Sequence, residues 1–504
     1  MRTAHSVDTV RAAERRLMAQ LPEGALMRRA AAGLAAACAE LLGRVYGSRV
    51  TVLAGSGDNG GDALYAAARL ARRGAGVTAV LLSPDRAHPA ALAALRGAGG
   101  RVVEAAESEG VAGVTDSEAA GAVRRADLVL DGIVGIGGKG GLRPVAAALA
   151  RTADESPGTT VAVDLPSGVD ADTGEVAEEA VRADATVTFG TYKPGLLIDP
   201  GHAYAGALRL VPIGLDLLDP QGPPDPRYHA APPGLEALQY ADVAALLPLP
   251  AAESDKYRRG VVGIAAGSVR YPGAPVLAVA GALRAGAGAV RYAGPAAEAV
   301  TARFPEALVS SGLPSEAGRV QAWVVGPGLG DGEDAEAALR DVLTARVPLL
   351  MDADALGLAD PEQIRSRTAP TVLTPHAGEA ARLLGADRAD VERQRLASVR
   401  ELASRFRATV LLKGSTTLVA APDAARAVRV NATGTSWLAT AGAGDVLSGL
   451  IGSLLATGLD PLDAASAGAY LHGLAGRHAA DGAPLAAHDI AAALPAAWRD
   501  VRER

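Results

Sequence analysis

The sequence predicts two α/β domains, each built on a largely parallel β-sheet. In both halves of the 504-residue chain, short apolar runs end in glycine-rich or polar loops, and helical stretches lie between them. This alternation is typical of parallel sheets covered by helices. A proline-rich stretch without periodicity, residues 216–235, separates the halves and predicts a linker. We therefore expect domains at residues 1–215 and 236–504, in keeping with a length that exceeds one ordinary core.

The first half contains three strand–loop units. Residues 48–82 predict a strand, a glycine loop, a helix and a second strand, while 126–137 and 159–170 each predict a strand ending in a polar loop. Loops that follow the strands of a parallel sheet lie at its carboxyl edge, where such sheets bind ligands. We expect the first domain to carry its site there.

The second half repeats the strand–loop pattern with different motifs. Five apolar runs each end in a polar or glycine loop, at residues 260–268, 321–330, 347–356, 370–379 and 408–420. The loop motifs of the two halves share neither order nor spacing, so the halves are not an internal repeat. They predict a second, distinct α/β domain.

Composition narrows the classes of function. Apolar residues make up 49% of the chain, charged residues make up 21%, and the net charge is −7, which argues against a nucleic-acid-binding protein. The first residues do not resemble a signal peptide, and no uncharged apolar run is long enough to span a membrane. The single cysteine, Cys38, cannot form an internal disulfide, which predicts a cytoplasmic protein.

The loop "GSGDNGGD", residues 55–62, follows the first strand of residues 48–82. It superficially resembles a dinucleotide-binding turn, but that pattern alone is a weak signal. The carboxylates of Asp58 and Asp62 would repel a pyrophosphate and would suit a cation or a sugar hydroxyl better. The alternative is a tight turn in which Asp58 or Asn59 caps the following helix.

Two further strands of the first half end in a carboxylate. Asp131 precedes a second glycine loop, and Asp164 precedes "LPSGVDADTG". Each can be a structural cap, but a carboxylate at this edge can also transfer protons. Oxygen ligands suit hard cations, and Asn59, Asp131 and the hydroxyl of Ser167 provide such a set.

Taken in order, "GSGDNGGDALYAAARLA", "DGIVGIGGKG" and "DLPSGVDADTG" resemble the epimerase domain of NAD(P)H-hydrate repair proteins. The resemblance implies a Rossmann-like three-layer αβα fold over residues 1–215, which interconverts the R and S forms of NADHX and NADPHX. It implies a potassium ion on Asn59, Asp131 and Ser167, and Asp164 as the acid/base residue that also contacts the hydrate. The remaining hydrate contacts would be Asp58, Asn59, Gly60, Gly61, Asp62, Gly135, Ile136, Gly137, Gly138, Lys139, Gly140 and Gly141. This chain departs from the family at Asp58, Ala63 and Ile136, where asparagine, glycine and threonine are usual.

The second half carries a glycine loop, "TAGAGD", residues 440–445, directly before an apolar helix. Its small residues would let phosphates approach backbone N–H groups at the positive end of the helix. Asp445 is then either a base or a helix cap. Lys413 follows an apolar strand and precedes a loop of small residues, which suits a phosphate. His376 lies three residues before Glu379 and is either a structural histidine or a ligand contact.

Together with "GPGLG", "DADAL", "TPHAGE" and "KGSTT", this loop resembles the ribokinase-like superfamily and, within it, the ADP- or ATP-dependent NAD(P)H-hydrate dehydratase. The match spans about residues 240–504, with Tyr257 and Ala441 where the family commonly has glycine. It implies Asp445 as the catalytic residue and ADP or ATP, with Mg²⁺, as co-substrate. The nucleotide would be bound by Lys413, Gly414, Ser415, Thr416, Thr417 and Gly444. The hydrate would be bound by Ala274, Gly328, His376 and Asp445.

We therefore predict a bifunctional repair enzyme that epimerises NADHX and NADPHX and dehydrates the S form. Two alternatives remain at this point. One is a regulatory protein whose first domain senses a nicotinamide ligand. The other is a small-molecule kinase of the ribokinase-like superfamily fused to a ligand-sensing domain. We expect a homo-oligomer in the cytoplasm that has neither nucleic acid nor membrane as a partner.

Overall fold

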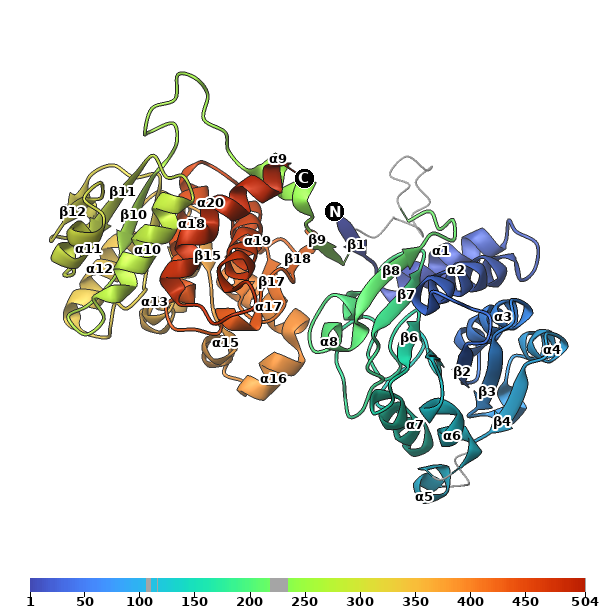
Figure 1. Ribbon diagram of the computed structural model, residues 1–504. Coiled ribbons are helices and arrows are strands. Elements are labelled where there is room, and N and C mark those ends of the chain that lie inside the picture. The colour runs from blue at the N-terminus through green and yellow to red at the C-terminus, as the bar shows by residue number, and fades with distance from the viewer. Residues whose placement is uncertain (106–109, 116, 218–233, 504) are drawn as a thin grey trace. The chain divides into compact units, whose positions relative to one another are not determined.

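The computed structural model describes residues 1–105, 110–115, 117–217 and 234–503. Most of the linker predicted at residues 216–235 therefore lies outside the described residues. The chain forms two compact units, Thr3–Gly234 and Met1–Arg2 together with Leu235–Arg504 (Figure 1). We call them the N-terminal and C-terminal units and describe each by itself.

The N-terminal unit is built on a seven-stranded sheet with the order β4-β3-β2-β5-β6-β7-β8. All its strand pairs are parallel. The order reverses between β2 and β5, which makes the loops after these strands a topological switch point. The strands of this sheet are β2 (Arg49–Ala54), β3 (Gly76–Leu81), β4 (Arg101–Glu104), β5 (Leu128–Gly132), β6 (Thr159–Val163), β7 (Ala185–Phe189) and β8 (Ala207–Val211).

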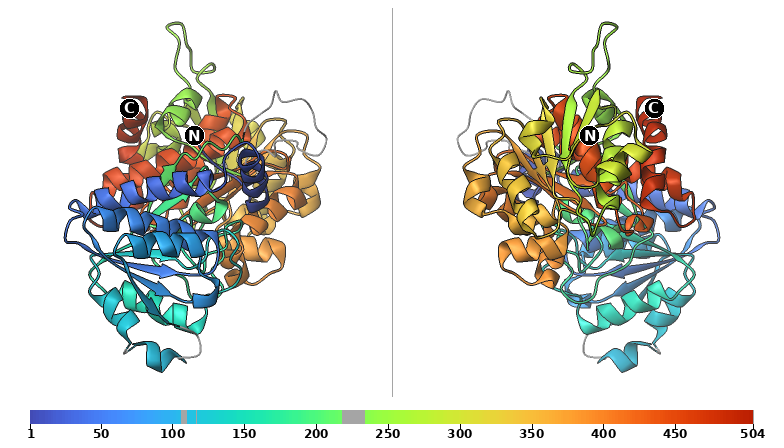
Figure 2. Two further views of the ribbon diagram at one scale, coloured as in Figure 1. Left: turned by 90° about the vertical axis from the view of Figure 1, so that its right-hand side faces the viewer. Right: turned by 90° about the vertical axis from the view of Figure 1, so that its left-hand side faces the viewer.

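Helices cover both faces of this sheet, so the unit has three layers. In Figure 2 the blue helices lie on one face and the teal helices on the other, with the sheet between them. The central strands are buried along their length, as expected for a sheet covered on both faces. The helices are α1 (Val7–Met18), α2 (Ala25–Leu42), α3 (Asp58–Arg72), α4 (Pro89–Gly97), α5 (Gly110–Thr115), α6 (Glu118–Arg124), α7 (Pro144–Asp154) and α8 (His202–Ala205).

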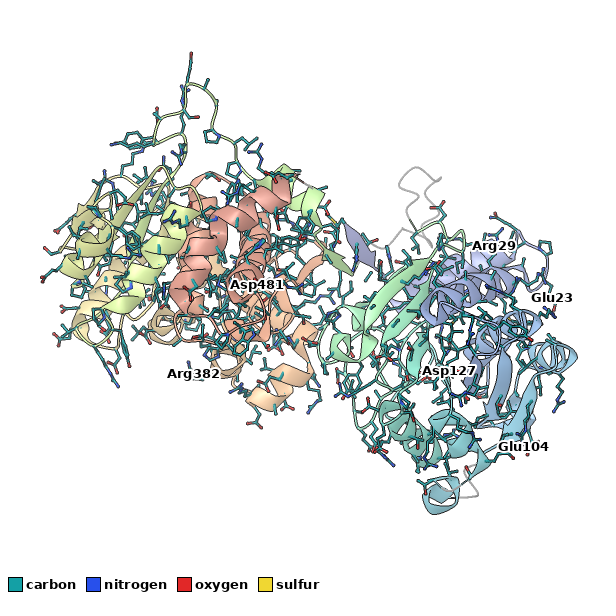
Figure 3. All side chains as sticks on the ribbon, in the orientation of Figure 1. Glu23, Arg29, Glu104, Asp127, Arg382 and Asp481 are labelled. Carbon is teal, nitrogen blue, oxygen red and sulfur yellow. The ribbon has the colours of Figure 1, made fainter. Side chains whose placement is uncertain are left out.

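An exposed ion pair lies at the amino edge of this sheet. Asp127, labelled in Figure 3, lies just before β5 and pairs with Arg49 at the start of β2, with 2.9 Å between Nη2 and Oδ1. Both side chains are exposed, so the pair aligns neighbouring strands and contributes little to stability.

The mixed sheet of the C-terminal unit has the order β1-β9-β18-β17-β16-β15-β14-β13-β10-β11-β12, with β1 (Arg2–Ala4) at one edge. The strands from β16 to β12 run parallel, while β17 is antiparallel to both of its neighbours. The strands are β9 (Leu235–Ala237), β10 (Val261–Ala265), β11 (Ala289–Ala293), β12 (Leu308–Ser310), β13 (Ala322–Val325), β14 (Leu349–Met351), β15 (Thr371–Leu373), β16 (Thr409–Leu412), β17 (Thr417–Ala420) and β18 (Val428–Asn431).

The largest core of the C-terminal unit lies between this sheet and the group α10, α18, α19 and α20 (Figure 1). The helices are α9 (Tyr240–Leu246), α10 (Gly273–Arg284), α11 (Ala297–Arg303), α12 (Glu333–Leu343), α13 (Asp354–Leu358), α14 (Pro361–Arg365), α15 (Ala377–Leu384), α16 (Arg388–Arg393), α17 (Arg395–Phe406), α18 (Ala443–Ala456), α19 (Pro461–Ala480) and α20 (Ala487–Glu503). Nowhere in the part of the chain that the structure describes is a helix both long and apolar enough to cross a membrane.

Helices α10 and α18 cross with their backbones in contact. A Cβ on Gly449 would lie 1.8 Å from the carbonyl oxygen of Ala278, and a Cβ on Gly281 would lie 2.2 Å from that of Val446. Neither distance is possible for a real side chain, so both positions require glycine. The crossing fixes α18, which begins at the loop that contains Gly442 and Gly444.

Candidate functional sites

The first candidate site lies at the carboxyl edge of the N-terminal sheet. Helix α3 begins at Asp58, and its N-cap is Gly57, which makes no side-chain capping bond. Asp58 to Asp62 therefore occupy the first helical turns, and the alternative in which Asp58 or Asn59 caps this helix is wrong. The chain before the helix is close-packed, because a Cβ on Gly55 would lie 1.9 Å from the carbonyl oxygen of Ile133.

Asp131, Ser167 and Asn59 come together at this edge. Asp131 is fully buried and accepts hydrogen bonds from Ser167 N (2.8 Å), Ser167 Oγ (2.6 Å) and Ile133 N (3.2 Å). Burial raises the pKa of Asp131 to about 6, although these hydrogen bonds oppose the shift. Asn59 lies beside the same segment, since a Cβ on Gly135 would be 2.9 Å from Asn59 Oδ1.

These three groups suit a monovalent cation. They provide carboxylate, hydroxyl and amide oxygens, the ligands that hard cations prefer. They include only one carboxylate, and across the described residues no three His, Cys, Asp or Glu side chains gather as a metal cage. The amide nitrogen of Asn59 is buried without a hydrogen-bond partner. Because amide nitrogen and oxygen can be exchanged by a flip, this side chain can turn its oxygen to the same place.

Asp164 lies at the end of the neighbouring strand β6, held by a buried lysine. Its Oδ1 accepts hydrogen bonds from Lys193 Nζ, Thr188 Oγ1 (3.0 Å) and Phe189 N (3.0 Å). Lys193 is 1% exposed and also donates to Thr188 Oγ1 and the carbonyl of Phe189, both at 3.0 Å. The backbone of Asp164 is left-handed, with φ at 66°. Such strain is uncommon outside glycine and is concentrated at functional sites.

A second carboxyl group faces this pair from α3. The Oδ1 atom of Asp62 is buried without a hydrogen-bond partner. Burial, followed by the charges of Asp164, Asp58 and Glu14, raises the pKa of Asp62 well above its ordinary value. Burial and the charge of Asp164 also raise the pKa of Glu14. The site thus combines a carboxylate paired with an ammonium and a carboxyl group that favours its protonated form.

Glu14 and Arg11 bring helix α1 to this site, and the sequence prediction missed both of them. Arg11 Nη2 lies 3.1 Å from where a Cβ on Gly137 would be. Gly135 to Gly141, which are predicted to contact the hydrate, form the loop after β5. The guanidinium of Arg11 lies beside this loop. Within this loop Lys139 is exposed, and Ile136 packs against a small apolar cluster.

The second candidate site gathers around Lys413 at the carboxyl edge of the C-terminal sheet. Lys413 Nζ donates to Asp352 Oδ1 (2.7 Å) and lies 3.8 Å from Glu379 Oε2. Burial lowers the pKa of Lys413, but these two carboxylates outweigh burial and the net shift is upward. Asp352 is 1% exposed and accepts a second hydrogen bond from Ser448 Oγ (2.7 Å). Asp352 and Ser448 are further site residues that the sequence prediction did not assign.

The glycine loop reaches this cluster. A Cβ on Gly444 would lie 3.6 Å from Lys413 Nζ and 3.8 Å from Asp352 Oδ2. The N-cap of α18 is Gly442, so the alternative that Asp445 caps the helix is wrong. Burial, followed by the charge of Asp352, raises the pKa of Asp445 to about 7, although Lys413 opposes the shift. Asp445 is thus poised to exchange a proton near neutral pH.

His376 has a structural contact in addition to any ligand role. It is the N-cap of α15, and its Nδ1 accepts from Gly378 N (3.0 Å) and Glu379 N (3.2 Å). The carboxylate of Glu379 accepts a hydrogen bond from the backbone N–H of His376. The His376 side chain is 56% exposed, and its Nε2 lies 3.5 Å from Glu379 Oε1.

The other predicted contacts of this domain fall into two groups. Gly328 has φ at 60°, and a Cβ there would lie 2.7 Å from that of Ala274, so these two residues are neighbours. Gly414, Ser415 and Thr416 follow β16, and Thr417 begins β17. Arg395 donates to the carbonyls of Lys413 and Thr416, which holds this loop in place.

Comparison with known proteins decides the family. Residues 23–195 match the family model described as YjeF-related protein N-terminus, and residues 262–496 match the model described as NAD(P)H-hydrate dehydratase. The chain is 50% identical to the bifunctional NAD(P)H-hydrate repair enzyme Nnr of Mycobacterium tuberculosis, covering 91% of this chain and 90% of that protein. The chain belongs to the bifunctional NAD(P)H-hydrate repair enzyme family. The family and the two-domain α/β fold class predicted from the sequence, Rossmann-like and then ribokinase-like, are confirmed.

More distant members of the repair enzyme family also match both halves. The Salinibacter ruber enzyme is 37% identical, covering 88% of this chain and 85% of that protein. Among solved structures, the ADP/ATP-dependent NAD(P)H-hydrate dehydratase of Bacillus subtilis, co-crystallised with ATP and Mg²⁺, matches with 32% identity and a TM-score of 0.48. That match covers 52% of this chain and 97% of that structure.

Proposed function

We propose that this chain repairs hydrated nicotinamide cofactors in two steps. Residues 1–215 interconvert the R and S forms of NADHX and NADPHX, residues 236–504 dehydrate the S form with ADP or ATP, and residues 216–235 join them. One observation carries the proposal. In each unit, the carboxylates picked out by the motifs gather at the carboxyl edge of the sheet, beside cations and glycine loops. Family membership supports the same substrates.

In the epimerase domain, Asp62 acts as the acid and Asp164 as the base. The hydroxyl-bearing carbon of the hydrate adjoins the ring nitrogen, so loss of the hydroxyl leaves a planar cation that the nitrogen lone pair stabilises. Asp62, protonated, gives a proton to the departing hydroxyl. Asp164, held in place by Lys193, takes a proton from the water that returns to the opposite face. A carboxyl group that favours its protonated form, as Asp62 does, is suited to act as the acid of such a pair.

Asn59, Asp131 and Ser167 would hold the potassium ion of this domain. When bound, the ion supplies positive charge that attracts the anionic hydrate. The residues of the site then orient the substrate: the loop from Gly135 to Gly141 offers backbone N–H groups, and Arg11 adds a second cation for phosphate.

In the dehydratase domain, Asp445 exchanges the proton of the hydrate's hydroxyl. The nucleotide phosphates lie on Gly444 and Lys413, at the start of α18. Asp445, once ionised, takes the hydroxyl proton as the oxygen attacks the terminal phosphoryl group, and the oxygen then leaves as phosphate. Loss of a neighbouring ring proton restores the double bond. With no three-residue acidic or histidine cage in the described chain, Mg²⁺ would arrive with the phosphates.

Incubation of the protein with mixed NADHX epimers tests this function. We expect absorbance of the reduced nicotinamide to return completely with ADP or ATP present and not to return without nucleotide. Exchange between the epimers should continue without nucleotide. A phosphorylated product that accumulates in place of NADH would instead support the small-molecule kinase. Binding of the hydrate without turnover would support the regulatory protein.

We further propose that the protein works in the cytoplasm as a homo-oligomer. The buried, unpaired thiol of Cys38 is compatible with a reducing compartment. Light scattering coupled to size exclusion measures the oligomeric state directly.

A further inference from the structure

The C-terminal unit contains a cavity of about 420 Å³ on the side opposite Asp445. Three segments line it: the loop between α9 and β10, the last residues of α10, and α20. That loop extends away from the helices at the top of Figure 1. The cavity also touches Thr457, which follows the last residue of α18, whereas Asp445 lies at the first turn of that helix. The length of α18 therefore separates the cavity from the candidate active site by roughly 20 Å.

Arginine dominates the cavity. Its lining includes Arg258, Arg259, Arg284, Arg499 and Arg502, and no lining residue is acidic. All five side chains are exposed, so water and salt screen their mutual repulsion in part. Their concentration in one cavity is unexpected in a chain whose net charge is −7. A bound anion would remove this repulsion.

Two of these five guanidinium groups donate hydrogen bonds to backbone carbonyls of the surrounding protein. Arg259 Nη2 donates to the carbonyl of Gly286 (3.1 Å), just past the end of α10, and Arg258 Nη1 donates to the carbonyl of Glu253 (3.3 Å). Within the described residues, Arg284, Arg499 and Arg502 form no ion pair with a carboxylate. Three guanidinium groups are thus available to a ligand, and two more keep unused N–H groups.

The size and the remaining wall of the cavity indicate the class of ligand. The volume falls within the range of small-molecule sites. Trp498 of α20 lines the cavity and is half-buried, so it offers a flat ring for stacking. Guanidinium groups bind phosphate oxygens through paired N–H donors. We propose that this cavity is a second nucleotide site, in which the arginines bind the phosphates and Trp498 stacks on the base.

Counting bound nucleotides by calorimetry tests the proposal. Wild type should bind two ADP molecules per chain. Gly444→Val, which obstructs the candidate active site, should bind one, and the double variant Arg284→Gln/Arg499→Gln should also bind one. Combining all three substitutions should abolish binding. Arg340→Gln, an exposed arginine of α12 outside the cavity, is the matched control and should bind two.

Pyrophosphate and ADP distinguish the parts of the ligand. In Gly444→Val, pyrophosphate should bind at the cavity and weaken by about 10-fold or more when Arg284 and Arg499 are replaced, as expected for two lost charge-assisted bonds. ADP should bind more tightly than pyrophosphate, and that advantage should vanish in Trp498→Leu. A single ADP per chain in wild type that is lost in Gly444→Val, or binding in Gly444→Val that the arginine substitutions leave unchanged, would overturn the proposal. Equal affinities for ADP and pyrophosphate would overturn the proposal that Trp498 stacks on a nucleotide base.

Discussion

The ammonium of Lys193 is in hydrogen-bond contact with Oδ1 of Asp164, and both groups are shielded from solvent. All three N–H groups of Lys193 have partners inside the protein, which are Asp164, Thr188 and the carbonyl of Phe189. Lys193 therefore has no donor left for a substrate. In the proposed mechanism Lys193 positions Asp164, and Asp164 would perform the proton transfer.

Lys193→Met should separate this positioning role from a merely structural one. Removing one partner of a buried pair costs about 3–5 kcal/mol, so we expect a lower melting temperature. Without the ammonium, Asp164 Oδ1 loses one of its three hydrogen-bond donors, so misplacement of this carboxylate should lower kcat of epimerisation by about 100-fold and leave KM unchanged. Lys256→Met, an exposed lysine in the other unit, is the control. An undiminished kcat in a folded variant would show that Lys193 only supports the fold.

Asp164→Asn should stop exchange of the R and S hydrates and leave ADP-dependent dehydration intact. Supplied with both epimers, the variant should consume the S portion quickly and then slow to the spontaneous rate of R-to-S conversion. The measurement is a biphasic absorbance trace, with circular dichroism as the folding check and Asp154→Asn, outside the site, as control. A single phase at the wild-type rate contradicts the assignment of Asp164.

Asp445→Asn should reduce dehydration by about 100-fold or more, the scale of lost acid/base catalysis, and leave epimerisation unchanged. In wild type, dehydration should rise with pH through about 7, because the pKa of Asp445 is raised to about 7 by burial and Asp352. Initial rates of S-NADHX consumption between pH 5 and 9 measure both effects. Near-normal dehydration by the variant would remove Asp445 from the mechanism.

The stability of Asp445→Asn should depend on pH in a defined direction. Because the folded pKa of Asp445 exceeds its ordinary value, the carboxyl stabilises the fold fully below pH 4, and this contribution is lost as pH rises through about 7. The variant should therefore be more stable than wild type at pH 8, by at most about 4 kcal/mol, and show no such advantage at pH 4. Chemical denaturation at both pH values gives the difference. Destabilisation at pH 8 would indicate a structural role.

Gly444→Val should block close approach of nucleotide phosphates to the start of α18. A Cβ at this position makes only ordinary contacts, so the fold should survive, but the added methyl groups occupy space beside Lys413. The activation of dehydration by ADP should disappear. Gly332→Val, where a Cβ would meet open space, is the control. Undiminished activation would place the phosphates elsewhere.

Potassium should stabilise the protein by mass action through Asn59, Asp131 and Ser167. At constant ionic strength, replacing tetramethylammonium chloride with potassium chloride should raise the melting temperature of the N-terminal unit. Ser167→Ala should weaken this response, and Ser156→Ala, outside the site, should keep it. No difference between the two salts in wild type would argue against a potassium ion at these residues.

The sequence motifs predicted the site residues that lie in loops directly after strands, because the carboxyl ends of parallel strands lie at one edge of the sheet. Asp131 and Ser167 lie together for this reason, whereas Gly444 reaches Lys413 from the first turn of α18. Sequence could not predict partners that arrive by long-range packing. Glu14 belongs to a helix that precedes the sheet, and its contact depends on how that helix folds back. Lys193 had a weak signal, because a lysine in the otherwise apolar, proline- and glycine-rich stretch after β7 is unusual.

The crossing of α10 and α18 places a remote constraint on the dehydratase chemistry. Because Gly281 and Gly449 allow the two backbones to touch, an added methyl group at either position would push α18 away from α10. That displacement would carry Asp445 away from Lys413 without changing any residue that touches a ligand. The substitutions that this domain tolerates therefore depend on the spacing of two helices as well as on its acids and bases. A substitution at a residue that never contacts the substrate can abolish turnover.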